Sequence, residues 1–221
     1  MADAEPFPKR AKVDFSESVR VLVGPSKKEF HVHVGALTRR STFFKAAVAQ
    51  RWTSEGQAKA VELPEDEPDV FSYYLQCLYF DTVCHDEMVN TSLLDQYILA
   101  DKLGDLFSAN TIINKIIRNS SKTRSIPSAT SVNYAYEKTT PNSPLRRLLV
   151  DFYVYRGHGD DICAAAEVVH AEFATALIRE FVRIRPGRNN PDAFSIFQNA
   201  KHRPRCHYHQ HDESCPPCVG D

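Results

Sequence analysis

A change of period within one stretch of the chain constrains its fold more than any other feature. From Phe30 onward, apolar residues alternate with polar ones, which is typical of a β-strand with one buried face. From Leu37 the apolar residues recur at helical spacing, and Ser41 is placed to cap a helix over Thr42–Gln50. An earlier apolar run, Val19–Val23, predicts a first strand that ends at a Gly-Pro turn. The stretch therefore predicts a β-hairpin that leads directly into a pair of helices.

Periodicity and capping signals predict the elements that follow. Ala60–Pro64 is typical of a short strand, and the apolar stripe after Pro68 predicts a central helix capped by Asp66. A polar linker begins at Asn119. Further helices are predicted from Thr91 or Ser92 to Leu103, over Phe107–Arg118, over Ser128–Lys138, from Pro144 with Ser143 as its cap, and from Asp160 or Asp161 to Ile184.

Composition excludes several functional classes. The chain has 221 residues, is 43% hydrophobic and 25% charged, and carries a formal net charge of −1. These values are ordinary for a globular protein and predict no general attraction to nucleic acid or acidic membranes. No apolar run approaches the roughly 20 residues needed to span a bilayer, and the polar N-terminus predicts no secretory signal. We therefore expect reduced thiols and a nuclear or cytoplasmic protein.

Two polar segments suggest functions outside the folded core. Lys9, Arg10 and Lys12 follow a proline in a flexible N-terminal segment, 1–17, and form a candidate nuclear localisation signal. Proline-rich residues 186–221 predict an extended tail with three cysteines and three histidines between Cys206 and Cys218. Cys206, His209, Cys215 and Cys218 are candidate zinc ligands there. The alternative, which we favour, is a polar tail without metal.

Signatures of catalysis are absent from the sequence. It contains no Gly-x-Ser-x-Gly elbow, no Walker-type phosphate loop and no Gly-x-Gly-x-x-Gly segment. His31 and His33 lie on one face of the second predicted strand, where a structural hydrogen bond explains them better than a metal does. We therefore expect no enzyme activity, no catalytic residue and no cofactor.

The quoted residues resemble a known family. The series Phe30, His33, Leu37, Ser41 and Phe43-Phe44 is similar to the central signature of the BTB/POZ domain, in the version common in fungal proteins. The segments Val61–Asp66, Pro68–Tyr79 and Tyr97–Leu103 follow in the order that the family shows. The resemblance implies an α+β fold, in which a small three-stranded sheet packs against a helical cluster.

The resemblance also implies protein partners. BTB/POZ domains are interaction modules, many of which form homodimers or act as substrate adaptors for cullin-type ubiquitin ligases. Cullin adaptors often carry a hydrophobic-x-Glu motif after the helical pair, whereas here Trp52 and Glu55 are one residue further apart. Trp52 and Glu55 are therefore candidate partner-binding residues.

The sequence thus predicts four segments: a flexible segment 1–17, a BTB/POZ domain 18–118, an all-helical extension 128–185 and a Pro/His/Cys-containing tail 186–221. The predicted function is a non-enzymatic interaction module for self-association or partner recruitment. Two alternatives stay open, namely a cullin-type ligase adaptor and a zinc- or nucleic-acid-binding regulator that acts through the tail.

Overall fold

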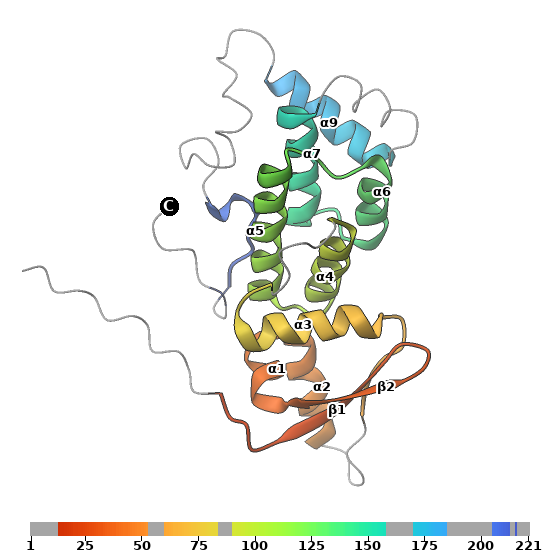
Figure 1. Ribbon diagram of the computed structural model, residues 1–221, viewed down its shortest axis with the longest axis vertical. Helices are drawn as coiled ribbons and strands as arrows, with labels where there is room; N and C mark the ends of the chain where they lie inside the picture. The colour runs from red at the N-terminus through yellow and green to blue at the C-terminus, as the bar shows by residue number, and fades with distance from the viewer. Residues whose placement is uncertain are drawn as a thin grey trace, which may run out of the picture.

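The computed structural model describes residues 13–52, 60–83, 90–157, 170–184, 205–212 and 215. Within them a small sheet and two short helices occupy one end of the molecule, and a stack of helices occupies the rest (Figure 1). None of the helices in this described part is long and apolar enough to cross a membrane.

The sheet has three strands in the order β2-β1-β3. β1 pairs antiparallel with β2, so that Val19 lies opposite Val32, and it pairs parallel with β3. The hairpin turn contains Gly24, whose positive φ of 76° is a conformation that glycine adopts without strain. Alternate residues of β1 are buried, as the period-two pattern predicts. The strands are Ser18–Val23 (β1), Lys28–His33 (β2) and Val61–Leu63 (β3).

Five helices are described around this sheet, and α3 lies between the end that holds α1 and α2 and the helices α4 and α5 (Figure 1). Ser41 caps α2 as predicted, because its Oγ accepts the Phe44 amide at 3.1 Å. The same hydroxyl donates to the Leu103 carbonyl at 2.5 Å and so ties α2 to the end of α4. These helices are Val34–Arg40 (α1), Thr42–Trp52 (α2), Pro68–Phe80 (α3), Asn90–Lys102 (α4) and Leu106–Thr123 (α5).

The helical extension stacks on α4 and α5 and shares one core with them (Figure 1). The buried Tyr97 hydroxyl of α4 lies 3.1 Å from Ser143 Oγ, and Arg156 donates to Ser120 on α5. The described elements of the extension are Ala129–Lys138 (α6), Pro144–Arg156 (α7) and Ala171–Arg183 (α9), followed by the short 3₁₀ helix Arg205–Tyr208 (η1).

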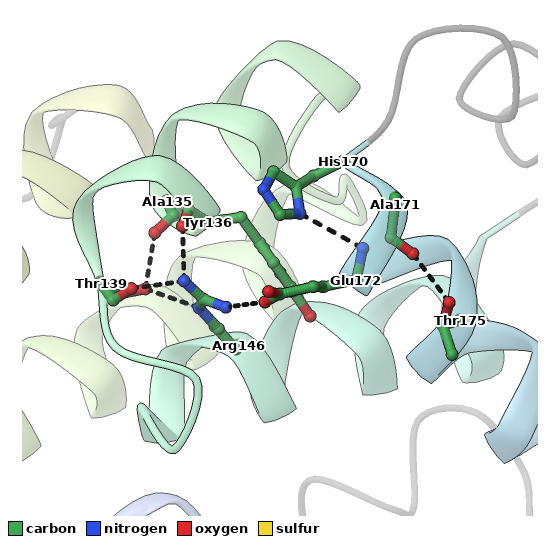
Figure 2. A network of polar contacts seen from close by, with 8 residues as sticks. All are labelled: Ala135, Tyr136, Thr139, Arg146, His170, Ala171, Glu172 and Thr175. Atoms are coloured by element: carbon green, nitrogen blue, oxygen red, sulfur yellow. Dashed lines mark hydrogen bonds and ion pairs between the residues drawn. The ribbon is translucent and has the colours of Figure 1, made fainter.

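A buried arginine joins the three helices of the extension (Figure 2). Arg146 of α7 donates to the Thr139 hydroxyl at 3.1 Å and to the carbonyls of Tyr136 and Thr139 at the end of α6. Its other nitrogen pairs with Glu172 of α9 at 2.5 Å. The guanidinium also lies 4.4 Å from the centre of the Tyr136 ring. Arg146 therefore satisfies carbonyls that the end of a helix leaves unpaired.

Several predicted helix boundaries are wrong. Glu67 rather than Asp66 precedes α3, because the Asp66 carboxylate pairs with Lys102 at 2.8 Å. α4 begins at Asn90, so the predicted caps Thr91 and Ser92 lie within it. α5 continues past Arg118 to Thr123.

α9 does not extend unbroken from Asp160, because His170 has a non-helical backbone and precedes the first turn. The His170 amide donates to the Asn133 side chain at 2.7 Å, and its Nδ1 accepts the Glu172 amide at 3.3 Å. Ser143 precedes α7 as predicted, but its hydroxyl contacts Tyr97 and does not cap the helix.

Candidate partner-binding surface

The buried Arg40 side chain connects the end of α1, the end of α3 and the start of α5. The Arg40 side chain, at the end of α1, is only 8% exposed. It donates to the Cys77 carbonyl at 3.3 Å and pairs with Asp81 at the end of α3. Its guanidinium lies 4.0 Å from the centre of the Phe107 ring, at the start of α5. Burial lowers the pKa of Arg40, and the nearby Asp105 carboxylate opposes that shift.

Three exposed phenylalanines lie at or near these helix ends in the chain. Phe80, the last residue of α3, is 68% exposed, and Phe43 and Phe107 are each 36% exposed. The Phe43 amide donates to the Leu103 carbonyl at 3.3 Å, which holds the start of α2 beside the α4–α5 turn. We name Phe43, Phe80 and Phe107 the phenylalanine face. Large apolar side chains that gather at the surface are typical of interaction sites.

The start of α5 is held rigidly beneath this face. Asp105 is fully buried and caps α5, because its carboxylate accepts the Ser108 amide at 2.9 Å. The Tyr74 hydroxyl of α3 donates to the same carboxylate at 3.2 Å. Burial, followed by the charge of Asp105, raises the pKa of Tyr74 well above its ordinary value, so the phenol keeps its proton.

A second aromatic group lies where the N-terminal segment meets the sheet. The exposed Phe15 ring packs edge-on against His33, with 5.0 Å between ring centres. The Tyr79 oxygen accepts the His33 amide at 3.2 Å and lies 2.8 Å from its Nδ1. The structural interpretation of His33 is therefore confirmed. The Nε2 atom of His31 lies 2.9 Å from the Glu29 carboxylate.

The sequence-predicted partner residue Trp52 is at the opposite end of α2 from Phe43. Trp52 is the last residue of α2, so it is about 14 Å of helix rise from Phe43 at the other end. The Trp52 side chain and the whole of Glu55 fall outside the described part of the chain. Lys9, Arg10 and Lys12 also lie outside it. Their roles in partner binding and nuclear import therefore remain predictions.

Part of the tail is folded against the helices, which differs from the extended conformation that its prolines predict. Tyr208 is 3% exposed, and its hydroxyl donates to the buried Asp151 of α7. Asn110 of α5 binds the backbone of Gln210 through both amide atoms, at 2.9 and 3.1 Å. His209, a predicted zinc ligand, lies 3.1 Å from the Asn114 side chain.

The candidate zinc ligands lie only partly within the described part of the tail. No three His, Cys, Asp or Glu side chains there are grouped so that they could hold a metal ion. Cys215 is buried, and the Asn110 amide lies 3.6 Å from its sulfur. Cys218 and the Cys206 side chain lie outside the described residues.

Sequence reasoning missed Arg40 and the phenylalanine face. A basic residue in the last turn of a short helix is usually a solvated dipole partner, so its type alone does not predict burial. Phe80 directly follows the apolar stripe of α3 in sequence, where periodicity does not separate a core residue from a surface one. Only the exposure of these side chains in the folded chain distinguishes them.

A three-stranded mixed sheet packed with a helical cluster defines an α+β domain. Comparison with known families agrees, since residues 14–113 match the model of the BTB/POZ domain. This part of the chain is a BTB/POZ domain, as the sequence motifs indicated. No curated protein matches the chain significantly. BTB/POZ domains are generally non-enzymatic modules that bind protein partners and often dimerise.

Proposed function

We propose that this protein recruits a protein partner, or a second copy of itself, through the phenylalanine face. The observation that carries the proposal is that the exposed Phe107 ring is held against the buried Arg40 side chain, which itself pairs with Asp81 beside Phe80. Side chains that are already ordered lose little conformational entropy when a partner covers them. Aromatic side chains also contribute most of the binding energy at the centres of many interfaces.

Binding rather than catalysis is the proposed activity of the whole chain. The family assignment supports it, because BTB/POZ domains generally have no enzymatic role. The sequence supports it as well, because it lacks the phosphate-binding and nucleophile motifs described above.

Affinity purification from the native cells with a paired surface variant tests this role. Phe80→Ala with Phe107→Ala removes two exposed rings, and we expect partner recovery to fall more than about tenfold. Ile178→Ala with Val182→Ala is the matched control, because both side chains are exposed on α9, in the extension. Equal recovery by the two paired variants, with unchanged melting temperatures, would show that the phenylalanine face is not the binding surface.

Self-association is separated from recruitment of another protein by sedimentation of the purified chain. If the face joins two copies, the wild type sediments as a dimer and the variant without the two rings as a monomer. A wild-type monomer at every concentration leaves recruitment of another protein as the role of the face.

The cullin-adaptor alternative is supported by Trp52 at the end of α2, followed in sequence by Glu55. Its test is the same purification with Trp52→Ala. Cullin and ubiquitin-ligase subunits recovered by the wild type and lost by this variant would establish the adaptor role. Their absence from the wild-type sample would exclude it.

A regulator that binds zinc through the tail is the remaining alternative. His211 favours it, because Nδ1 donates to the Cys215 carbonyl at 3.1 Å while the buried Nε2 has no hydrogen-bond partner among the described residues. Metal-binding histidines commonly donate their other ring nitrogen in this way. One bound zinc per purified chain, measured by metal analysis, would support this role, and metal-free folded protein would refute it.

A further inference from the structure

A groove at the junction of the BTB/POZ domain and the helical extension has the character of a binding site. It has a volume of about 450 Å³ and lies between the start of α3, α4 and α6. Val70, Ile98 and the buried Leu99 supply its apolar lining. The Tyr134 ring of α6 lines it as well and is 37% exposed. Because residue 134 lies beyond the matched domain, the groove exists only where the extension docks.

The charged groups around the groove are unevenly distributed. Four carboxylates line it, those of Glu65, Asp66, Glu67 and Asp95, against two lysines. Asp66 is not available to a ligand, because it pairs with Lys102 at 2.8 Å, and Glu65 lies 4.0 Å from the same ammonium group. That leaves Glu67 and Asp95 with one further lysine, Lys138, so the rest of the lining carries a net negative charge.

The environment of Tyr134 agrees with this distribution. Partial burial, a hydrogen bond to the Asp95 carboxylate and the charges of Asp95 and Glu67 raise the pKa of Tyr134 to about 12. The phenol thus stays neutral, and its ring lies beside two carboxylates. A ring next to carboxylates attracts a cation both through its π face and through the paired charges.

We propose that this groove binds a peptide segment of a partner protein in which lysine or arginine alternates with apolar residues. The cationic side chain lies over Tyr134 between Glu67 and Asp95, and the apolar neighbour packs on Val70 and Ile98. Charge complementarity and the apolar lining together select this chemistry over an acidic or purely apolar segment. The site is separate from the phenylalanine face, so its test is independent of the function proposed above.

Fluorescence anisotropy with two labelled probe peptides tests the groove in the full chain. One probe alternates leucine with arginine, and the other alternates leucine with glutamate. We expect the arginine probe to bind, the glutamate probe not to bind, and binding to weaken as salt is added. Equal binding of both probes, or binding of neither, would overturn the proposal.

Two sets of variants locate the binding. Glu67→Gln with Asp95→Asn removes the two carboxylates, and we expect affinity for the arginine probe to fall roughly tenfold. Asp14→Asn with Glu17→Gln makes the same charge change at two exposed residues near His33 and Tyr79, at the opposite end of α3 from Glu67, and is expected to leave affinity within about twofold. Equal losses in both variants would mean general attraction by charge and would overturn the site.

Tyr134→Ala separates the groove from charge alone. It leaves the net charge unchanged, so a purely electrostatic attraction would be unaffected. We expect Tyr134→Ala to lower the affinity for the arginine probe severalfold. The melting temperature should stay close to that of the wild type, because the ring is partly exposed. Unchanged affinity would contradict the arrangement proposed here.

Discussion

Replacement of Arg146 by methionine is expected to destabilise the helical extension in a measurable way. The guanidinium fills a buried position and satisfies acceptors on α6 and α9 (Figure 2). Methionine retains much of the apolar volume but donates no hydrogen bond. The Tyr136 and Thr139 carbonyls and the Thr139 hydroxyl then lose a donor inside the protein.

The magnitude follows from which acceptors stay buried. Glu172 is 58% exposed and regains water when Arg146 is removed, so that lost ion pair contributes less than about 1 kcal/mol. The acceptors at the end of α6 remain largely enclosed, and an unsatisfied buried acceptor costs about 1–3 kcal/mol. We therefore expect a loss of about 3 kcal/mol, which lowers the melting temperature of a chain of this size by about 6–12 °C.

Thermal and urea denaturation measure this loss, and the chain offers a matched control. Arg147 is the next residue of α7 and is exposed, so Arg147→Met should change stability by less than about 0.5 kcal/mol. Glu172→Gln should cost less than about 1 kcal/mol, because the arginine keeps its other acceptors. Equal stabilities of Arg146→Met and Arg147→Met would refute the role assigned to the buried guanidinium.

Three further predictions concern other parts of the chain. Gly35→Ala should destabilise the protein by about 1–3 kcal/mol in urea denaturation, because the alanine methyl group would lie 2.4 Å from the Asp14 carbonyl oxygen. This clash outweighs the preference of alanine for helices. A more stable variant would contradict this prediction. Tyr208→Phe should release the tail from α7, because the buried Asp151 loses its phenol donor. We expect a loss of about 1–3 kcal/mol in the free energy of unfolding and faster hydrogen exchange in the tail. Unchanged exchange would exclude this anchor. Burial raises the pKa of Tyr97 from about 10 to about 12, so the contribution of this pKa shift to stability is present below pH 10 and lost between pH 10 and 12. Tyr97→Phe should remove the loss of stability that Tyr97 causes in this range. An unchanged dependence of stability on pH would show that Tyr97 does not cause the alkaline loss.

The elements that sequence predicted well depend on neighbouring residues. The hairpin, the capping of α2 by Ser41 and the buried face of β1 follow from signals within a few residues of each other. The start of α9 was missed because it depends on a distant partner, the Asn133 side chain of α6. Local patterns carry no information about such a contact.

The candidate sites depend still more on distant contacts. Arg40 and Asp81 are 41 positions apart, and Asn110 and Gln210 are 100 apart. Amino-acid type indicated that the tail is polar and rich in histidine, but it did not indicate that Tyr208 would be buried. The groove beside Tyr134 likewise requires α4 and α6 to be placed together, which no motif in the sequence specifies.

The docked segment around Tyr208 also bears on the order in which the protein folds. Asp151 and Asn110 are synthesised well before Tyr208 and Gln210, so the two earlier side chains lack these partners while translation continues. Closing such long loops delays the contacts, because the chain loses conformational entropy before the bonds form. We therefore expect the helices to assemble first and the 205–212 segment to join them last, as the step that removes the Asp151 carboxylate from water.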